Sequence, residues 1–211
     1  MVVFHVCYDL RYFGYVDWQI PTGPGWWQFR YLILSLFLGT AGISLALYHS
    51  PAIRWRPFWK RAGQIALAAL AISLVSLVVF PQGWIYFGIL HFILVASLIS
   101  IGLVRFPQVA LGLGLAILAI HWLDMLSPRW PFNGISDYLP GYTEDFVPLL
   151  PWLGVVFVGV WLGGLVRAQK LPAGGLHLPR WLDFAARHSL AIYLLHQPLL
   201  FGLFFLVGKY A

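Results

Sequence analysis

Two ionisable residues close to the start of the chain, His5 and Asp9, have the spacing of a catalytic pair. Residues four apart on a helix share one face, where a carboxylate can orient an imidazole and stabilise its protonated form. Such a pair can act as a general base, or as a nucleophile with its orienting group. The alternative is structural, because the same side chains can satisfy each other's hydrogen bonds against a neighbouring helix. The cost of burying a carboxylate in an apolar helix favours the catalytic interpretation.

Three further histidines, His91, His121 and His196, also interrupt apolar runs. His121 and Asp124 are three apart and repeat the pairing of imidazole and carboxylate, although a position of Asp124 at the membrane surface explains it equally well. His91, within YFGILHFI, can line a cavity or form a hydrogen bond between two helices. The last apolar run carries a polar stripe at helical spacing, formed by Ser189, Tyr193, His196 and Gln197. We expect that stripe to face protein or a cavity rather than lipid.

The elements that must position these residues are membrane-spanning helices. Of the 211 residues, 61% are hydrophobic and 9% are charged, which is too little charge to cover a water-soluble globule of this size. Six stretches are long and apolar enough to cross a bilayer core of about 30 Å. They are residues 29–48, 62–80, 84–104, 108–126, 149–166 and 188–207. The predicted fold is all-α: a polytopic helical membrane bundle of six full transmembrane helices, forming a single domain over residues 1–211.

Residues 1–15 predict a seventh span that is too short to cross the bilayer, and we expect its first half to lie upstream of Met1. At about 1.5 Å of rise per residue, the four histidines fall within a middle band about 10 Å deep. That common depth predicts one internal cavity beside His5 and Asp9. The residues expected to line it are His91, His121, Asp124, Tyr193, His196 and Gln197.

The positions of Lys and Arg predict the orientation in the membrane. If the first span runs outward, one side holds nine of the 13 basic residues, and that side should be cytoplasmic. Four of the nine can bind the phosphates of a cytoplasmic ligand, or can reflect orientation alone: Arg54, Arg56, Lys60 and Arg61. A long loop on the other side carries acidic residues that can shape an entrance for an acceptor, or can be ordinary solvated surface: Asp137, Glu144 and Asp145.

Several other kinds of site are not expected. The net charge of +6 does not indicate nucleic-acid binding, because the basic residues are spread between apolar spans rather than gathered on one soluble face. No two of the four histidines have the spacing of metal ligands on one helix, so we expect no metal. Gly159 and Gly163, in GVWLGG, form a small-residue face that predicts close packing of two helices.

Four motifs, in order along the chain, resemble a known family. FHVCYDLRYFG, YFGILHFI, DYLP followed by PLLPWLG, and RHSLAIYLLHQPL are similar to bacterial membrane proteins related to the catalytic domain of heparan-α-glucosaminide N-acetyltransferase. The resemblance implies a membrane acyltransferase of the inner membrane. Such an enzyme takes an acyl group, here expected to be acetyl, from cytoplasmic acyl-CoA and delivers it to a hydroxyl or amine acceptor, expected to be a sugar, on the far side.

The resemblance also bears on individual residues. In the wider group of acyltransferases the first helix begins with an arginine and an aspartate before reaching a histidine. His5 matches that histidine, while the beginning has no counterpart. The catalytic histidine proposed for the lysosomal enzyme lies in a loop after the first helix, and PTGPGWWQF has none. The membrane lipids and a small-molecule or glycan acceptor are the expected partners.

Two functions of other classes remain open at this point. Histidines at the middle of a membrane can relay protons, which is typical of small proton-coupled transporters. Transporters commonly show repeated halves and broken helices, and neither is visible in this sequence. A non-catalytic membrane subunit is the third possibility. Such a subunit would bind no CoA and would co-purify with another protein.

Overall fold

The structure is a computed structural model that describes residues 1–21, 23–125, 127, 129–143, 145–169 and 179–210. All regular elements among these residues are helical, which confirms the predicted all-α class. The chain divides into two compact units, residues 1–34 with 174–211, and residues 35–173. We call them the terminal unit and the central unit. The prediction of a single domain stays a prediction.

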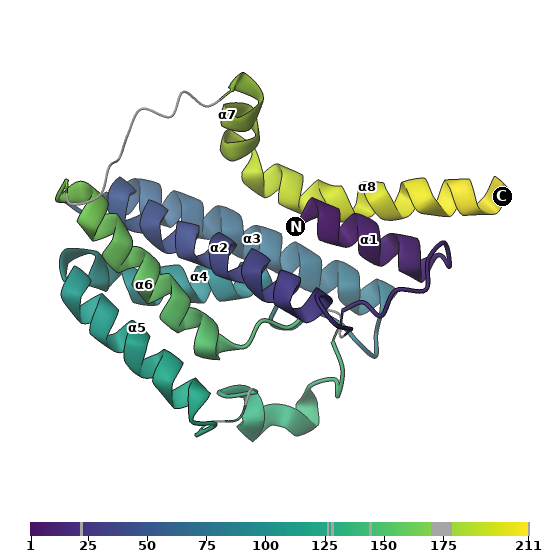
Figure 1. The fold of residues 1–211 in the computed structure, drawn as a ribbon, viewed down its shortest axis with the longest axis horizontal. Helices are drawn as coiled ribbons and strands as arrows, with labels where there is room; N and C mark the ends of the chain where they lie inside the picture. The colour runs from purple at the N-terminus through teal and green to yellow at the C-terminus, as the bar shows by residue number, and fades with distance from the viewer. Residues whose placement is uncertain (22, 126, 128, 144, 170–178, 211) are drawn as a thin grey trace. The chain divides into compact units, whose positions relative to one another are not determined.

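Ten helical elements follow one another along the described residues (Figure 1). They are α1 (Val2–Tyr12), α2 (Trp26–Tyr48), α3 (Trp55–Val79), α4 (Ile89–Ser100), the 3-10 helix η1 (Ile101–Arg105), α5 (Pro107–Trp122), the 3-10 helix η2 (Phe132–Tyr138), α6 (Leu149–Arg167), α7 (Arg180–Arg187) and α8 (Ser189–Tyr210).

Four of the helices are long and apolar enough to cross a membrane: α2, α3, α6 and α8 up to Val207. They correspond to four of the six predicted spans. The two remaining apolar segments, Ile89–Arg105 and Pro107–Trp122, form shorter helices. The expectation of six full transmembrane helices is therefore not confirmed.

The two shorter segments have local causes. Residues 84–88 do not join α4, because side chains hold their backbone in another conformation: Ser76 Oγ accepts a hydrogen bond from the Ile85 N–H at 2.9 Å. At the other segment, α5 ends at Trp122 and Asp124 adopts a left-handed conformation with φ 52°, which stops a helix. Hydropathy alone predicts neither the loop before α4 nor the turn that ends α5.

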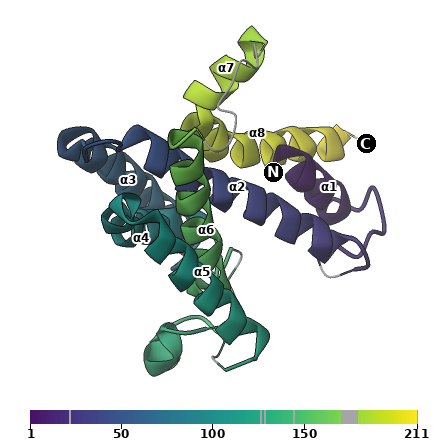
Figure 2. The same ribbon diagram turned by 60° about the vertical axis from the view of Figure 1, so that its left-hand side comes forward.

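Helix α6 crosses α2 in the central unit (Figure 2), and glycines lie where the two helices pack together. A Cβ atom added at Gly159 would collide with the Gly39 carbonyl, and one added at Gly42 would collide with the Val156 carbonyl. A Cβ atom at Gly163 would lie 2.7 Å from the Ala46 Cβ. The two backbones therefore approach each other as only small residues permit, which confirms the packing predicted for Gly159 and Gly163.

The same device joins α6 to α5 on another side. A Cβ atom at Gly154 would lie 2.9 Å from the Gly114 carbonyl oxygen, and one at Gly114 would lie 3.0 Å from the Gly154 carbonyl oxygen. Near the C-terminal end of α6, a Cβ atom added at Gly164 would lie 2.8 Å from the Pro107 Cβ. Helix α6 is thus packed against both α2 and α5, and all three are held at backbone distance.

The ends of the central unit differ in charge. At one end the loop before α6 is joined to the loop before α4: Thr143 Oγ1 donates to the Trp84 carbonyl at 3.0 Å, and the Ile89 N–H donates to Asp145 Oδ2 at 3.3 Å. At the other end of the α4–η1 segment lies Arg105, which shares a surface depression with Arg167. Asp145 and the two arginines therefore lie at opposite ends of the α4–η1 segment.

In the terminal unit, α1 and α8 lie side by side and run in the same direction (Figure 1). Residue numbers rise in the same direction along both helices in the contacts between them. The His5 ring contacts His196, and the Phe13 ring lies 5.1 Å from Phe201 and 6.0 Å from Phe204, centroid to centroid. Aromatic pairs at these separations stabilise the contact beyond the area they bury. The two helices thus present their polar residues to each other.

Candidate active site

The polar residues of α1 and α8 meet in one cluster, formed by His5, Asp9, His196 and Gln197. The ring centroids of His5 and His196 are 4.9 Å apart, with one ring edge-on to the other. One turn further along, Gln197 Nε2 donates to Asp9 Oδ1 at 3.0 Å, and the Asp9 side chain is completely buried. His5 and Asp9 therefore both face α8, as their spacing on one helical face predicts.

Hydrogen bonds within α8 assign the protonation of His196. Its Nδ1 lies 2.7 Å from the Tyr193 carbonyl oxygen and 3.1 Å from the Ile192 carbonyl oxygen. A carbonyl oxygen only accepts, so we assign the hydrogen of the neutral ring to Nδ1. The Nε2 of that tautomer carries a lone pair. His196 thus presents a basic nitrogen whose orientation is fixed from the other side of the ring.

Three atoms of this cluster are buried without a hydrogen-bond partner: Asp9 Oδ2, His196 Nε2 and Gln197 Oε1. One other buried side-chain atom among the described residues, Ser100 Oγ, shares this property. Each of the three is an acceptor. Asp9 Oδ2 is a carboxylate oxygen, and His196 Nε2 carries the lone pair of its tautomer. Gln197 Oε1 is the amide oxygen, because the Nε2 of the same amide donates to Asp9. A buried acceptor without a donor costs about 1–3 kcal/mol. Three of them together match a ligand with several N–H or O–H donors, such as an amine, a hydroxyl or water.

His91, by contrast, has a partner on each ring nitrogen. Ser73 Oγ donates its proton to the Ile85 carbonyl at 2.6 Å, so at 3.0 Å it accepts from His91 Nε2. His91 Nδ1 accepts from the Gly88 N–H at 3.3 Å. These bonds tie the loop before α4 to α3. The geometry matches the hydrogen-bonding interpretation that the sequence left open beside the cavity-lining one.

His121 and Asp124 lie at the exposed end of α5 in the central unit, whereas His5 and His196 belong to the terminal unit. The Asp124 N–H donates to the His121 carbonyl at 3.0 Å in the turn that ends the helix. Of the four predicted cavity histidines, the structure brings His5 and His196 together. A cavity shared by all four stays a prediction.

The predicted entrance residues differ in their surroundings. Asp145 caps the N-terminus of α4 through the Ile89 N–H, and Asp137 is exposed on η2. Glu144 lies outside the described residues. Tyr193, predicted to line the cavity, is half-buried, and its ring centroid lies 5.8 Å from that of His196.

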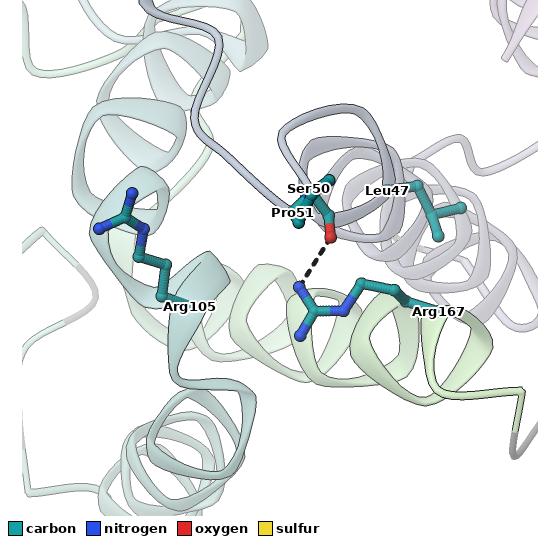
Figure 3. Close-up of a pocket in the computed structure, with 5 residues that line it drawn as sticks. All are labelled: Leu47, Ser50, Pro51, Arg105 and Arg167. Carbon is teal, nitrogen blue, oxygen red and sulfur yellow. Dashed lines mark hydrogen bonds between the residues drawn. The ribbon is translucent and has the colours of Figure 1, made fainter.

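The basic residues proposed for phosphate binding are all exposed, and the Arg54 guanidinium lies over the Tyr48 ring, 5.2 Å from its centroid. The structure draws attention to a second group, Arg105 and Arg167, which line a depression together with Ser50 (Figure 3). Sequence reasoning used these two arginines only to orient the chain. The signal that could have singled them out is the lack of any acidic residue in residues 35–123 and 146–173.

Comparison with known proteins gives one match. The family described as heparan-alpha-glucosaminide N-acetyltransferase, catalytic, matches residues 1–198. No curated protein and no solved structure matches the chain. The matched region covers most of both units and includes all four residues of the α1–α8 cluster. The chain therefore belongs to the family of the heparan-α-glucosaminide N-acetyltransferase catalytic domain.

Proposed function

We propose that the protein is a membrane acyltransferase that moves an acyl group, expected to be acetyl, from acyl-CoA to a hydroxyl or amine acceptor at the α1–α8 cluster. Membership of the acetyltransferase family supports the reaction class. The observation that carries the choice of site is the unpartnered Nε2 of His196, buried beside two further unpartnered acceptors.

Acyl transfer to a hydroxyl or amine requires a base that removes a proton from the acceptor. His196 Nε2 takes the proton of the acceptor O–H or N–H as that atom attacks the carbonyl carbon of the thioester. The C–S bond breaks, and the imidazolium returns the proton to the departing thiolate of CoA. The step needs the neutral imidazole, because only that form has a lone pair on Nε2 to take the proton.

The other three side chains have supporting roles in this proposal. Asp9 Oδ2 and Gln197 Oε1 accept hydrogen bonds from the acceptor molecule and hold its nucleophilic atom near the base. The Asp9 carboxylate also stabilises positive charge that develops on the imidazole. His5, edge-on to His196, is the second imidazole in reach and the alternative base or transient acyl carrier.

The sidedness of the reaction belongs to the same proposal. The end of the central unit that carries Arg105 and Arg167 is cytoplasmic in this proposal, because basic loops favour that side of a bacterial inner membrane. Acyl-CoA then comes from the cytoplasm, and a sugar acceptor is acylated on the other side.

The test is acyl transfer in proteoliposomes supplied with radiolabelled acetyl-CoA and a panel of amino sugars and neutral sugars. The wild type should label an acceptor, and a His5→Ala/His196→Ala variant should label none above background. Donor turnover in the wild type that persists undiminished in the variant would remove the cluster from the reaction. Solute flux without any acyl donor would instead support proton-coupled transport. Failure to bind CoA, with stable co-purification of another protein, would support a non-catalytic subunit.

A further inference from the structure

A surface depression of about 600 Å³ lies at the basic end of the central unit (Figure 3). Its lining residues are Leu47, Ser50, Pro51, Arg105 and Arg167. Arg167 Nη1 donates to Ser50 Oγ at 2.9 Å, and both arginine side chains are exposed. Three elements therefore contribute polar groups to one open hollow: the residues after α2, the end of η1 and the last turn of α6.

Backbone packing fixes these three elements relative to one another. Gly163 packs against Ala46 near the end of α2, and Gly164 packs against Pro107, two residues after Arg105. Arg167 follows these glycines by one helical turn. The arginines are thus mounted on elements held at backbone distance, which limits how far their charges can move apart.

The depression has a marked excess of positive charge. Residues 35–123 and 146–173 contain no aspartate or glutamate, so the central unit supplies no carboxylate from the elements that form this end. The Ser50 hydroxyl is neutral and occupies one of the five N–H donors of the Arg167 guanidinium. An anion in the depression is attracted by both positive charges.

We propose that Arg105, Arg167 and Ser50 form a binding site for the phosphate group of an anionic ligand. Guanidinium groups bind phosphate through paired N–H donors, and arginines from two elements together with a hydroxyl suit a tetrahedral anion. Where the ligand is CoA, this inference rests on the proposed function and assigns part of its donor site, and where the ligand is a phospholipid it goes beyond acyl transfer.

The rest of the depression indicates what the phosphate is attached to. Leu47 and Pro51 make part of the lining apolar, and Leu47 also borders a second depression along α2, formed with Thr40, Ile43, Ser44 and Tyr48. The ligand therefore carries a less polar extension next to its phosphate. Two kinds of molecule have this chemistry: CoA, with its phosphates and pantetheine arm, and a phospholipid, with its headgroup phosphate and acyl chains.

The experiment measures binding to the purified full chain with two matched pairs of probes. One pair is CoA and pantetheine, which lacks the phosphates. The other is a short-chain phosphatidylglycerol and the diacylglycerol with the same chains. In at least one pair the wild type should bind the phosphate-bearing member at least about tenfold more tightly, as expected for charge-assisted hydrogen bonds. The pair that shows the preference identifies the source of the phosphate.

Variants then assign that preference to the site. Arg105→Gln and Arg167→Gln should each weaken binding of the phosphate-bearing probe about tenfold, whereas Arg180→Gln, which removes one exposed arginine elsewhere, should change it less than about twofold. Arg167→Lys keeps the charge but not the paired donors and should retain part of the affinity. Ser50→Ala should give a smaller loss and a folded protein.

Two results overturn the proposal. One is a wild type that prefers the phosphate in neither pair. The other is a preference that survives both glutamine substitutions, or that falls equally in Arg180→Gln, since either would make the attraction a general surface effect. Elution volume and thermal unfolding of each variant show that it is folded. Because CoA without an acyl group is the probe, none of these outcomes depends on whether transfer occurs.

Discussion

Two histidines in apolar helices, His196 and His91, have opposite hydrogen-bonding states. His91 has both nitrogens occupied, by the Ser73 hydroxyl and the Gly88 N–H, and these bonds hold a loop to two helices. His196 has one nitrogen bound to carbonyls of its own helix and the other buried without a partner. Under the proposed function, an intramembrane histidine takes part in chemistry only where one of its ring nitrogens has no hydrogen-bond partner. Each prediction below tests one side of that difference.

The largest effect is expected for His196→Gln. The amide can still occupy the position of the ring but cannot take a proton, so acyl transfer should fall about 100-fold or more. The matched control is His188→Gln, since His188 Nδ1 also lies close to a carbonyl one turn back, at 2.9 Å from Phe184 O, and its side chain is exposed. Initial rates of label transfer measure both variants. Equal rates in the two would show that the unused nitrogen is not the base.

Asp9→Asn should have the next largest effect and should separate activity from stability. The amide can still accept from Gln197, but it replaces an unpartnered charged oxygen by a donor or a neutral acceptor. We expect transfer to fall about 10- to 100-fold, less than the loss of the base itself. The unfolding temperature should stay the same or rise, because a buried carboxylate is costly. A drop in both quantities would mean that Asp9 is a structural residue.

His91→Ala should show the reverse pattern. It leaves the Gly88 N–H without its acceptor and the Ser73 oxygen without its donor, so the free energy of unfolding should fall by about 1–3 kcal/mol. The rate of acyl transfer per folded molecule should remain close to that of the wild type. Denaturant unfolding in detergent gives the first quantity and the transfer assay gives the second. A large loss of rate without a loss of stability would place His91 in the reaction.

The sequence predicted the membrane class, the helical fold and the places of four long helices, because these follow from hydropathy summed over many residues. It placed the start of α3 at residue 62, whereas the helix begins at Trp55. It did not predict that residues 84–88 leave the helix. Trp84, Tyr86 and Phe87 are as apolar as a span requires, and the hydrogen bonds that hold this loop come from Ser73, Ser76 and His91. Hydropathy does not report which side chains satisfy the backbone.

Only part of the candidate site was predicted, because helical spacing does not report contacts between helices. Helical spacing placed His5 and Asp9 on one face and His196 and Gln197 in one stripe. It could not show that these two faces meet, because α1 and α8 are almost 190 residues apart and spacing describes only one helix at a time. The fixed tautomer of His196 also depends on carbonyl geometry that residue types do not encode.

A third histidine, His49, is buried outside the membrane-spanning helices, and it should give the smallest effect. It follows α2, is 4% exposed, and its Nδ1 accepts from the Arg54 N–H at 3.2 Å. Burial, and secondly the positive charge of Arg54, lower the pKa of His49 below its ordinary value of 6.5. Protonation would place a proton on the nitrogen that now accepts the hydrogen bond, so the folded protein favours the neutral ring.

The sign of the pH effect follows from that direction. The unfolded chain takes up a proton near pH 6.5, and the folded chain does so only at lower pH. The contribution of His49 to stability is therefore complete above about pH 6.5 and is lost as the pH falls through the folded-state pKa. In His49→Asn the side-chain oxygen can accept from the Arg54 N–H and does not titrate. Between about pH 8 and pH 5.5, values that bracket the ordinary histidine pKa, the unfolding temperature of the wild type should fall more than that of the variant. Parallel curves for the two proteins would show that the fold does not lower the pKa of His49, and would contradict the prediction.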